Sequence, residues 1–165
     1  GEAVARRAKG FGMDILYHNR TPKPEAEKEL NAKLVSLDEL LRQSDFVVSL
    51  VPLTEATKHL FDKEAFQKMK RTGIFIHASR GQKVEAAALI EALKTKEILA
   101  AGLDVFSQEP IRADHPLVQL DNAVCLPHIG SASHETRVNM LTLCLENMVS
   151  HFNGTGVKTP VNLTE

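Results

Sequence analysis

The sequence predicts an α/β fold built on a doubly wound parallel sheet. Short apolar runs alternate along the chain with segments of helical periodicity, which is the pattern of repeated strand–helix units. The run over residues 46–51 is apolar except for Ser49, as expected of a strand that is buried on both faces. Polar residues follow these runs directly, and in such a sheet the carboxyl ends of the strands meet at one edge.

Each expected strand is a short apolar run that ends in polar or turn-forming residues. We expect strands over residues 15–17, 46–51, 73–77, 98–105 and 123–126. Pro52 ends the second of these runs, and the small and polar residues 78–81 close the third.

The expected helices show apolar residues at three- and four-residue spacing, or a capping signal at their first residue. We expect helices over residues 2–10, 25–33, 36–41, 62–69, 84–96 and 133–153. Ser36 stands three residues before Glu39, which is the spacing of a capping box. Ser133 caps the last helix, and Gly154 ends it.

Composition excludes some classes of function. The 165 residues are 43% hydrophobic and 25% charged, which is ordinary for a globular chain that folds as one domain. A net charge of −1 gives no electrostatic reason to expect a nucleic acid or a membrane surface as a partner. Cys125 and Cys144 stand in apolar contexts without metal-ligand spacing, so we expect buried thiols in a reducing compartment. Because the sequence shows no signal peptide and no long apolar run, we expect a cytoplasmic protein.

The loop after the first expected strand carries a candidate phosphate-binding group. In a dinucleotide-binding fold an acidic residue in this loop bonds the ribose 2′-hydroxyl of NAD. Here the loop reads His18-Asn19-Arg20-Thr21 and holds no carboxylate. Arg20 with its amide and hydroxyl neighbours suits the 2′-phosphate of NADP instead, because a guanidinium bonds phosphate oxygens bidentately. A solvated surface charge is the alternative interpretation of Arg20.

Two more loops with candidate residues follow strands at the same edge. The proline after the 46–51 run either shapes a loop that lines a cofactor cleft or only ends the strand. Arg80 follows the 73–77 run, where its guanidinium could hold a substrate carboxylate through a fork of two hydrogen bonds.

Glu109 and His128 form the most specific candidate pair for catalysis, because they lie on loops that follow neighbouring strands. Glu109 could bond one ring nitrogen of His128 and so present the other nitrogen to a substrate as a general acid or base. No second His or Cys lies at zinc-ligand spacing from His128, and no G-x-S-x-G motif indicates a serine triad. The other histidines considered, which we interpret as structural or solvated, are His59, His77, His115, His134 and His151.

Over nearly its whole length the sequence resembles the D-isomer-specific 2-hydroxyacid dehydrogenases, and within them the glyoxylate/hydroxypyruvate reductase branch. The matching stretches, in chain order, are GEAVARRAKGFGMDILYHNRTPKP, SDFVVSLVPLTEATKHLF, FQKMKRTGIFIHASRG, AAGLDVFSQEP and LPHIGSAS. The resemblance implies a Rossmann-type domain and an oxidoreductase. It also implies hydride transfer between NADPH and C2 of a small 2-oxo acid such as glyoxylate or hydroxypyruvate. NAD is the less favoured cofactor.

The resemblance also implies a role for each candidate residue. His128 would donate the proton to the nascent alkoxide, Glu109 would orient His128, and Arg80 would bind the substrate carboxylate. Asp104 would contact the nicotinamide carboxamide, and Gly1 would be the third glycine of the dinucleotide fingerprint. The remaining positions implied to lie along the cofactor are Asn19, Arg20, Thr21, Val51, Pro52, Leu53, Thr57, Ala78, Ser79, Gly130 and Ser131.

The sequence also departs from the family pattern. Residues 1–165 lack the first two fingerprint glycines, the first strand and the separate substrate-binding domain, so we expect a partial NAD(P)-binding domain. Its long helix, residues 133–153, would lead back toward the substrate-binding domain. We expect this chain to come from a longer protein or to be its ordered part, to be inactive alone, and to form a homodimer.

Two other functions remain open at this stage. A nucleotide-regulated co-repressor or scaffold could share this fold, and so could a dimerisation module with no activity of its own. Relatives of the co-repressor kind resemble NAD users with an acidic residue after the second strand. The Arg20 loop and the lack of a basic surface run favour the enzyme.

Overall fold

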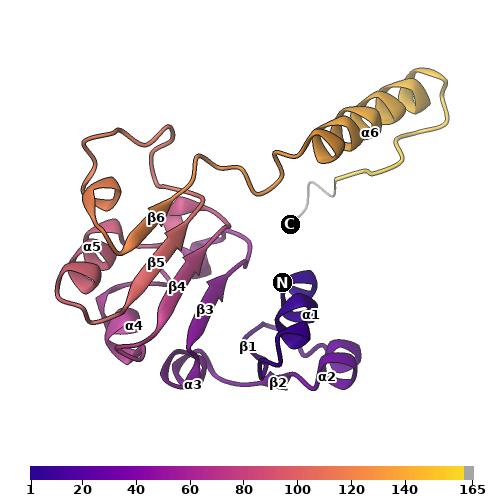
Figure 1. Ribbon diagram of the computed structural model, residues 1–165. Coiled ribbons are helices and arrows are strands. Elements are labelled where there is room, and N and C mark those ends of the chain that lie inside the picture. The colour runs from indigo at the N-terminus through magenta and orange to yellow at the C-terminus, as the bar shows by residue number, and fades with distance from the viewer. Residues whose placement is uncertain (162–165) are drawn as a thin grey trace. The chain divides into compact units, whose positions relative to one another are not determined.

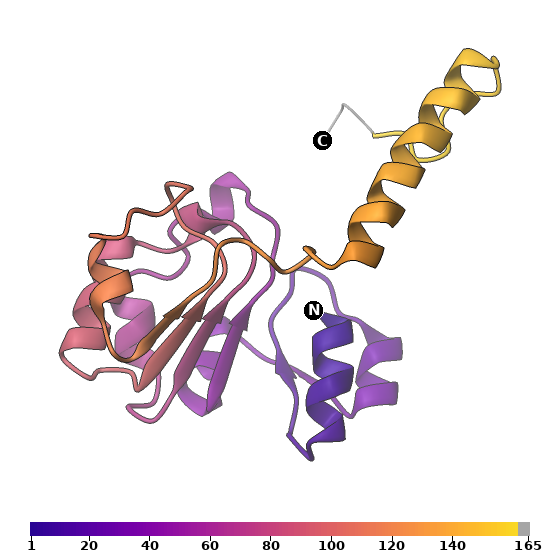
Figure 2. The same cartoon turned by 45° about the horizontal axis from the view of Figure 1, so that its top comes forward.

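The computed structural model describes residues 1–161 and divides the chain into two compact units (Figures 1 and 2). The first unit is Gly1–Pro127, and the second begins at His128. Every strand pairing within the first unit is parallel, which confirms the predicted doubly wound parallel fold.

The first unit holds two parallel sheets. The two-stranded sheet consists of β1 (Leu16–Tyr17) and β2 (Lys33–Leu34), and its helices are α1 (Glu2–Gly10) and α2 (Pro24–Leu30). The four-stranded sheet has the order β3 (Phe46–Ser49), β4 (Ile74–His77), β5 (Ala100–Leu103) and β6 (Ala123–Cys125). The helices α3 (Leu37–Gln43), α4 (Lys63–Lys68) and α5 (Ala86–Lys94) connect its strands, as do the short 3-10 turns η1 (Glu55–Thr57), η2 (Gly81–Lys83) and η3 (Pro116–Gln119).

The strand β2 was not expected, because the sequence predicts a helix over residues 25–33. The helix ends earlier, at Leu30, because Asn31 adopts the left-handed conformation with φ of 53°. Asparagine tolerates that conformation better than most residues, so it stops the helix. The chain is then free to extend, and Lys33 pairs with Leu16.

The predicted cap of α3 is present, and α4 has a side-chain cap as well. The Ser36 hydroxyl accepts a hydrogen bond from the Glu39 N–H at 3.1 Å, so α3 begins where the sequence predicts. Asp62 caps α4 by accepting from the Ala65 N–H at 2.9 Å. Such bonds satisfy backbone donors that the first turn of a helix leaves open.

The core of the first unit lies between the four-stranded sheet and the helices α3, α4 and α5. Phe75 of β4 is fully buried there between Phe61 and Phe66, with ring-centroid separations of 4.8 and 5.3 Å. Leu89 and Leu93 of α5 are buried against the same cluster, as the predicted inner face of that helix requires. This packing fixes the carboxyl end of β4.

Only one face of β3 is buried, so the prediction of a strand buried on both faces was wrong. Val47 and Ser49 face the core, whereas Phe46 is 46% and Val48 is 38% exposed. The reason is that, within the described residues, the core cluster packs on the Val47 face of this sheet.

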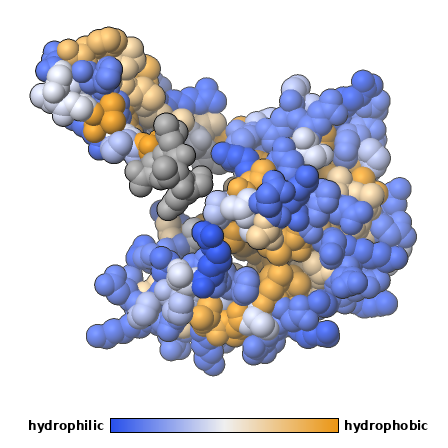
Figure 3. Space-filling model, turned by 180° about the vertical axis from the view of Figure 1, so that it is seen from behind, coloured by the Kyte–Doolittle hydropathy of each residue, from blue (hydrophilic) through white to orange (hydrophobic). Residues whose placement is uncertain are grey.

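The second unit contains α6 (His134–Phe152), whose N-terminus is capped by Ser133 as predicted. Within this unit no described residue of α6 is buried, and Figure 3 shows apolar surface on it. Its large exposed hydrophobic residues are Val138, Met140, Leu141, Leu143, Leu145, Met148, Val149 and Phe152. Cys144 is exposed on the same helix, so the expectation of a buried thiol was wrong there, whereas Cys125 is partly buried. No helix within residues 1–161 is both long and apolar enough to cross a membrane.

Candidate active site

The carboxyl ends of β3, β4 and β5 lie side by side in the first unit. The strand register pairs Ser49 with His77, and His77 with Leu103. Three loops therefore leave the sheet at one edge, namely residues 50–57, 78–81 and 104–109. This arrangement is the one that the alternating pattern of strands and helices predicts, and it brings the loops of Arg80, Asp104 and Glu109 to the same edge.

The turn that carries Arg80 is held by hydrogen bonds from the buried residues His77 and Lys83. The Arg80 carbonyl oxygen lies 3.0 Å from Nε2 of His77 and accepts from the Lys83 N–H at 3.2 Å. The Arg80 side chain is exposed, and its Nη1 donates to the Ser79 carbonyl at 2.7 Å. Within residues 1–161 Arg80 forms no ion pair, so its guanidinium suits an anionic ligand.

Polar side chains are buried beneath this turn. His77 is 1% exposed, and burial lowers the pKa of its imidazole to about 4, with a smaller contribution from the charge of Lys83. The neutral ring donates from Nε2 to the Arg80 carbonyl, which leaves Nδ1 as an acceptor. Among the described residues, neither Nδ1 of His77 nor Oγ of Ser49 has a hydrogen-bond partner.

The Glu109 loop is tied to the sheet through its backbone. Oε1 of Glu109 accepts a hydrogen bond from the Phe106 N–H at 2.9 Å, and this bond closes a turn around residues 106–109. The Asp104 N–H donates to the His77 carbonyl at 2.9 Å, which extends the β4–β5 pairing by one residue. The carboxylates of Asp104 and Glu109 are thus placed by loops that start from a fixed strand end.

His128, Gly130 and Ser131 belong to the second unit. The strand β6 ends at Cys125, and the Leu126 N–H still donates to the Leu103 carbonyl at 2.8 Å. His128 follows Pro127 and adopts a left-handed backbone with φ of 54°. Glu109 belongs to the first unit, and the pairing of His128 with Glu109 stays a prediction.

The candidate cofactor loop leaves β1 and precedes α2. Asn19 donates from Nδ2 to the Thr21 carbonyl at 3.2 Å, and this bond shapes the loop around Arg20. The Arg20 side chain is exposed and forms no ion pair within the described part of the chain. A cationic fork without a carboxylate beside it fits a ribose phosphate better than a ribose hydroxyl.

Residues 51–57 form a loop that is stabilised by hydrogen bonds of the Thr57 hydroxyl. The Thr57 hydroxyl donates to the Pro52 carbonyl at 2.8 Å and accepts from the Thr54 N–H at 2.8 Å. Both bonds of the Thr57 hydroxyl are therefore made within the loop itself. Val51 is half-buried, whereas Pro52 and Leu53 are exposed and Ala78 is exposed on the neighbouring loop.

Gly1 caps the start of α1, and its carbonyl accepts from Val4 and Ala5 at 3.0 Å. A Cβ at Gly1 would meet no described atom within 4 Å. The close helix–strand packing implied for this glycine is therefore not made by residues 1–161.

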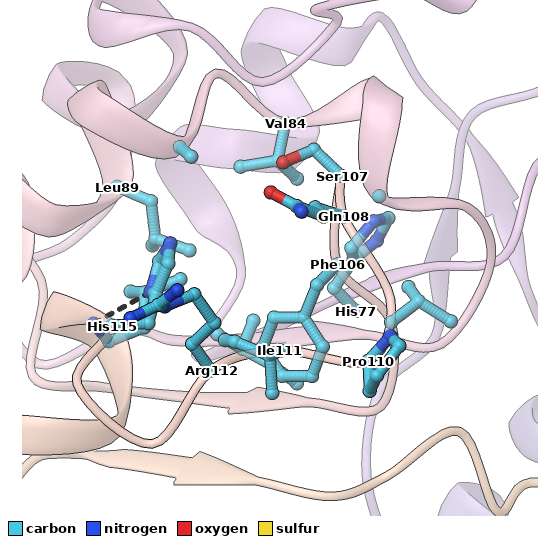
Figure 4. A pocket seen from close by; sticks show the side chains of 15 residues that line it. His77, Val84, Leu89, Phe106, Ser107, Gln108, Pro110, Ile111, Arg112 and His115 are labelled. Atoms are coloured by element: carbon cyan, nitrogen blue, oxygen red, sulfur yellow. Dashed lines mark hydrogen bonds between the residues drawn. The ribbon is translucent and has the colours of Figure 1, made fainter.

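A cavity of about 100 Å³ lies beside these loops but does not coincide with the predicted site (Figure 4). It is lined mainly by α5, by η2 and by the segment that runs from residue 105 to residue 117. Its polar lining includes His77, Gln108 and Arg112, and none of the predicted site residues lines it. Within residues 1–161 no group of His, Cys, Asp and Glu side chains is arranged to hold a metal ion.

The family described as D-isomer specific 2-hydroxyacid dehydrogenase, NAD binding domain, matches residues 1–130. The chain belongs to this family. The match covers the strands, the Arg20 loop and the three loops described above, so the predicted resemblance is confirmed.

Similar proteins of this dehydrogenase family include named reductases. The chain is 52% identical over 163 residues to the glyoxylate/hydroxypyruvate reductase B of Klebsiella pneumoniae, and 52% identical to that of Citrobacter koseri. These alignments cover 98% of this chain and 50% of each relative, so the chain spans about half the length of the curated relatives it matches.

Solved structures of the family superpose closely on this chain. A glyoxylate reductase from Paecilomyes thermophila has a TM-score of 0.90 at 37% identity, over 100% of this chain and 50% of that one. An NADPH-dependent glyoxylate/hydroxypyruvate reductase from Sinorhizobium meliloti, in complex with NADP and malonate, has a TM-score of 0.88 at 34% identity. That match covers 96% of this chain and 49% of the other.

Sequence reasoning missed the buried polar group of Ser49, His77 and Lys83. Ser49 was visible as the one polar residue in an apolar run, but His77 was interpreted as structural or solvated. Lys83 stands just before the predicted helix over residues 84–96, and no local pattern distinguishes it from a surface lysine. Its burial follows from packing that only the folded chain has.

Proposed function

We propose that the protein carrying this chain reduces small 2-oxo acids of the glyoxylate and hydroxypyruvate type with NADPH. One observation carries this proposal: the turn after β4 exposes the guanidinium of Arg80, which forms no ion pair among residues 1–161. A fork of donors at a strand end of a nucleotide-binding sheet is suited to a carboxylate. The names of the relatives, which are reductases of these two acids, support the substrate class.

The cofactor preference rests on the Arg20 loop. In the proposed complex Asn19, Arg20 and Thr21 surround the ribose 2′-phosphate, with Arg20 supplying the charge. The loops over residues 51–57 and 78–79 line the rest of the cofactor, and Asp104 bonds the carboxamide. When bound, the reduced nicotinamide supplies a hydride to C2 of the acid.

The chain's own residues would bind the substrate and move one proton. Arg80 holds the substrate carboxylate and polarises the neighbouring carbonyl, which orients C2 for attack. His128 donates a proton to the alkoxide oxygen that forms, and Glu109 orients the imidazole of His128. The hydrogen bond from the Phe106 N–H to Oε1 of Glu109 holds this carboxylate on the turn after β5. Gly130 and Ser131 line the same pocket as His128 in the proposed complex. A second copy of the chain is the proposed partner.

A co-repressor or scaffold function gains no support from the comparisons, because the named relatives are reductases and dehydrogenases. The decisive experiment measures NADPH oxidation by the complete protein with glyoxylate and with hydroxypyruvate. We expect turnover with both acids by the complete protein, and none with residues 1–165 alone. No turnover by the complete protein with either acid contradicts the proposal.

A further inference from the structure

A buried ammonium group lies beside the turn that carries Arg80. Lys83 is 0% exposed and ends η2, the short turn that leads from Arg80 toward α5. Its Nζ donates a hydrogen bond to Oγ of Ser79 at 3.2 Å. Among residues 1–161 no carboxylate forms an ion pair with Lys83. A buried charge without a counter-charge is strongly unfavourable, so stability alone does not explain a lysine here.

Lys83 acts on the same turn at two points. Its backbone N–H donates to the Arg80 carbonyl at 3.2 Å, while its side chain reaches Ser79. The Ser79 carbonyl in turn accepts from Nη1 of Arg80 at 2.7 Å. Ser79 is therefore bonded to both cations, through its hydroxyl to Lys83 and through its carbonyl to Arg80.

The aliphatic stem of Lys83 cannot be the whole explanation of the residue. A methionine or leucine would fill similar space without desolvating a charge. The pKa of the Lys83 ammonium is lowered by burial, and next by the positive charge of Arg80. What distinguishes lysine from an apolar residue at this position is the bond that its Nζ donates to the Ser79 hydroxyl.

We propose that Lys83 is a positioning residue, which fixes the Ser79–Arg80 turn from inside the protein so that the Arg80 guanidinium meets a substrate carboxylate. The proposal rests on the proposed function, in which Arg80 binds a 2-oxo acid. Lys83 itself is fully buried and does not touch the substrate. Its contribution is to substrate affinity, since the hydride and the proton come from other groups.

The test is Lys83→Met in the complete protein, which keeps the length of the stem and removes the ammonium group. We expect KM for glyoxylate to rise about tenfold, as loss of one charge-assisted hydrogen bond predicts, with kcat within about twofold of wild type. The Kd for NADPH should stay at its wild-type value. The melting temperature should not fall, because an unpaired buried charge has been removed. Lys63→Met, at an exposed lysine on α4, is the matched control and should change none of these quantities.

A double-variant cycle separates positioning from packing. Ser79→Ala should raise KM by itself, and adding Lys83→Met should raise it no further, because both changes remove the same bond. An unchanged KM in Lys83→Met contradicts the proposal, and so does a raised KM that comes with a lowered melting temperature. Additive effects of the two substitutions contradict it as well.

One further measurement does not depend on activity. If the wild-type complete protein reduces no 2-oxo acid, the proposed function has failed, and amide hydrogen exchange of residues 79–83 decides whether Lys83 positions the turn. Faster exchange in Lys83→Met, with wild-type exchange in Lys63→Met, supports positioning. Unchanged exchange in Lys83→Met contradicts it.

Discussion

Gly81 and Phe106 are in backbone contact, so the turn of Arg80 and the loop of Glu109 pack against each other without space for a side chain. A Cβ on Gly81 would lie 1.9 Å from the Phe106 carbonyl carbon and 2.3 Å from the Ser107 nitrogen. Both neighbours are backbone atoms, which cannot rotate away. The loops that follow β4 and β5 are therefore joined at this glycine, and the spacing between the two candidate residues depends on it.

Gly81→Ala should destabilise the protein by about 3 kcal/mol, because the two loops must separate to admit the methyl group. Urea unfolding measures the loss. Gly10→Ala is the matched control, because no described atom lies within 4 Å of its added Cβ, and it should unfold at or above the wild-type urea midpoint. Equal midpoints for Gly81→Ala and wild type would show that the loops can move apart freely.

Arg80→Gln should lower kcat/KM for 2-oxo acids about a hundredfold in the complete protein, because two charge-assisted hydrogen bonds to the carboxylate are lost. The Kd for NADPH should stay at its wild-type value. Arg71→Gln removes an exposed arginine from the turn before β4 and serves as the control. A similar loss in both variants would point to net charge rather than to carboxylate binding.

Arg20→Ala should weaken NADPH binding by about tenfold and leave NADH binding unchanged, because NADH has no 2′-phosphate. Fluorescence titration of the complete protein with each reduced cofactor measures the two Kd values. Arg42→Ala, an exposed change on α3, is the control. Equal weakening of both cofactors in Arg20→Ala would remove the basis for the NADP preference.

His77 makes the stability of the first unit depend on pH in a defined interval. Burial lowers its folded-state pKa to about 4, from an ordinary value of 6.5 in the unfolded chain. Between these values the unfolded chain binds the proton and the folded chain does not, so stability is full above pH 6.5 and falls as the pH drops toward 4. The loss attributable to His77 is about 3 kcal/mol.

His77→Gln should abolish that contribution, so the difference in unfolding free energy between wild type and variant should shrink as the pH falls from 6.5 to 4. Urea unfolding at several pH values measures it. His151→Gln, at an exposed histidine of α6, should keep the wild-type pH dependence. A His77→Gln curve that stays parallel to the wild-type curve would mean that the folded protein protonates His77 at no cost.

Local patterns in the sequence were enough to place most elements. The cap at Ser36, the inner face of α5 and the start of α6 follow from side-chain chemistry within one or two turns, so they could be predicted. The end of α2 at Asn31 and the short strand β2 could not, because a two-residue strand exists only through its pairing with β1. The burial of one face of β3 likewise depends on which elements pack on that sheet.

The sequence by itself determined the fold class and the edge at which the Arg80, Asp104 and Glu109 loops emerge, because right-handed connections between alternating strands and helices leave few topologies open. Its motifs also resembled the family to which the chain belongs. Only the tertiary structure decided how the Arg80 turn is held. His77 and Lys83 bond it from a fully buried position, and Gly81 locks it against Phe106. The physical reason is that burial and backbone contact arise between segments distant in sequence, so no local pattern records them.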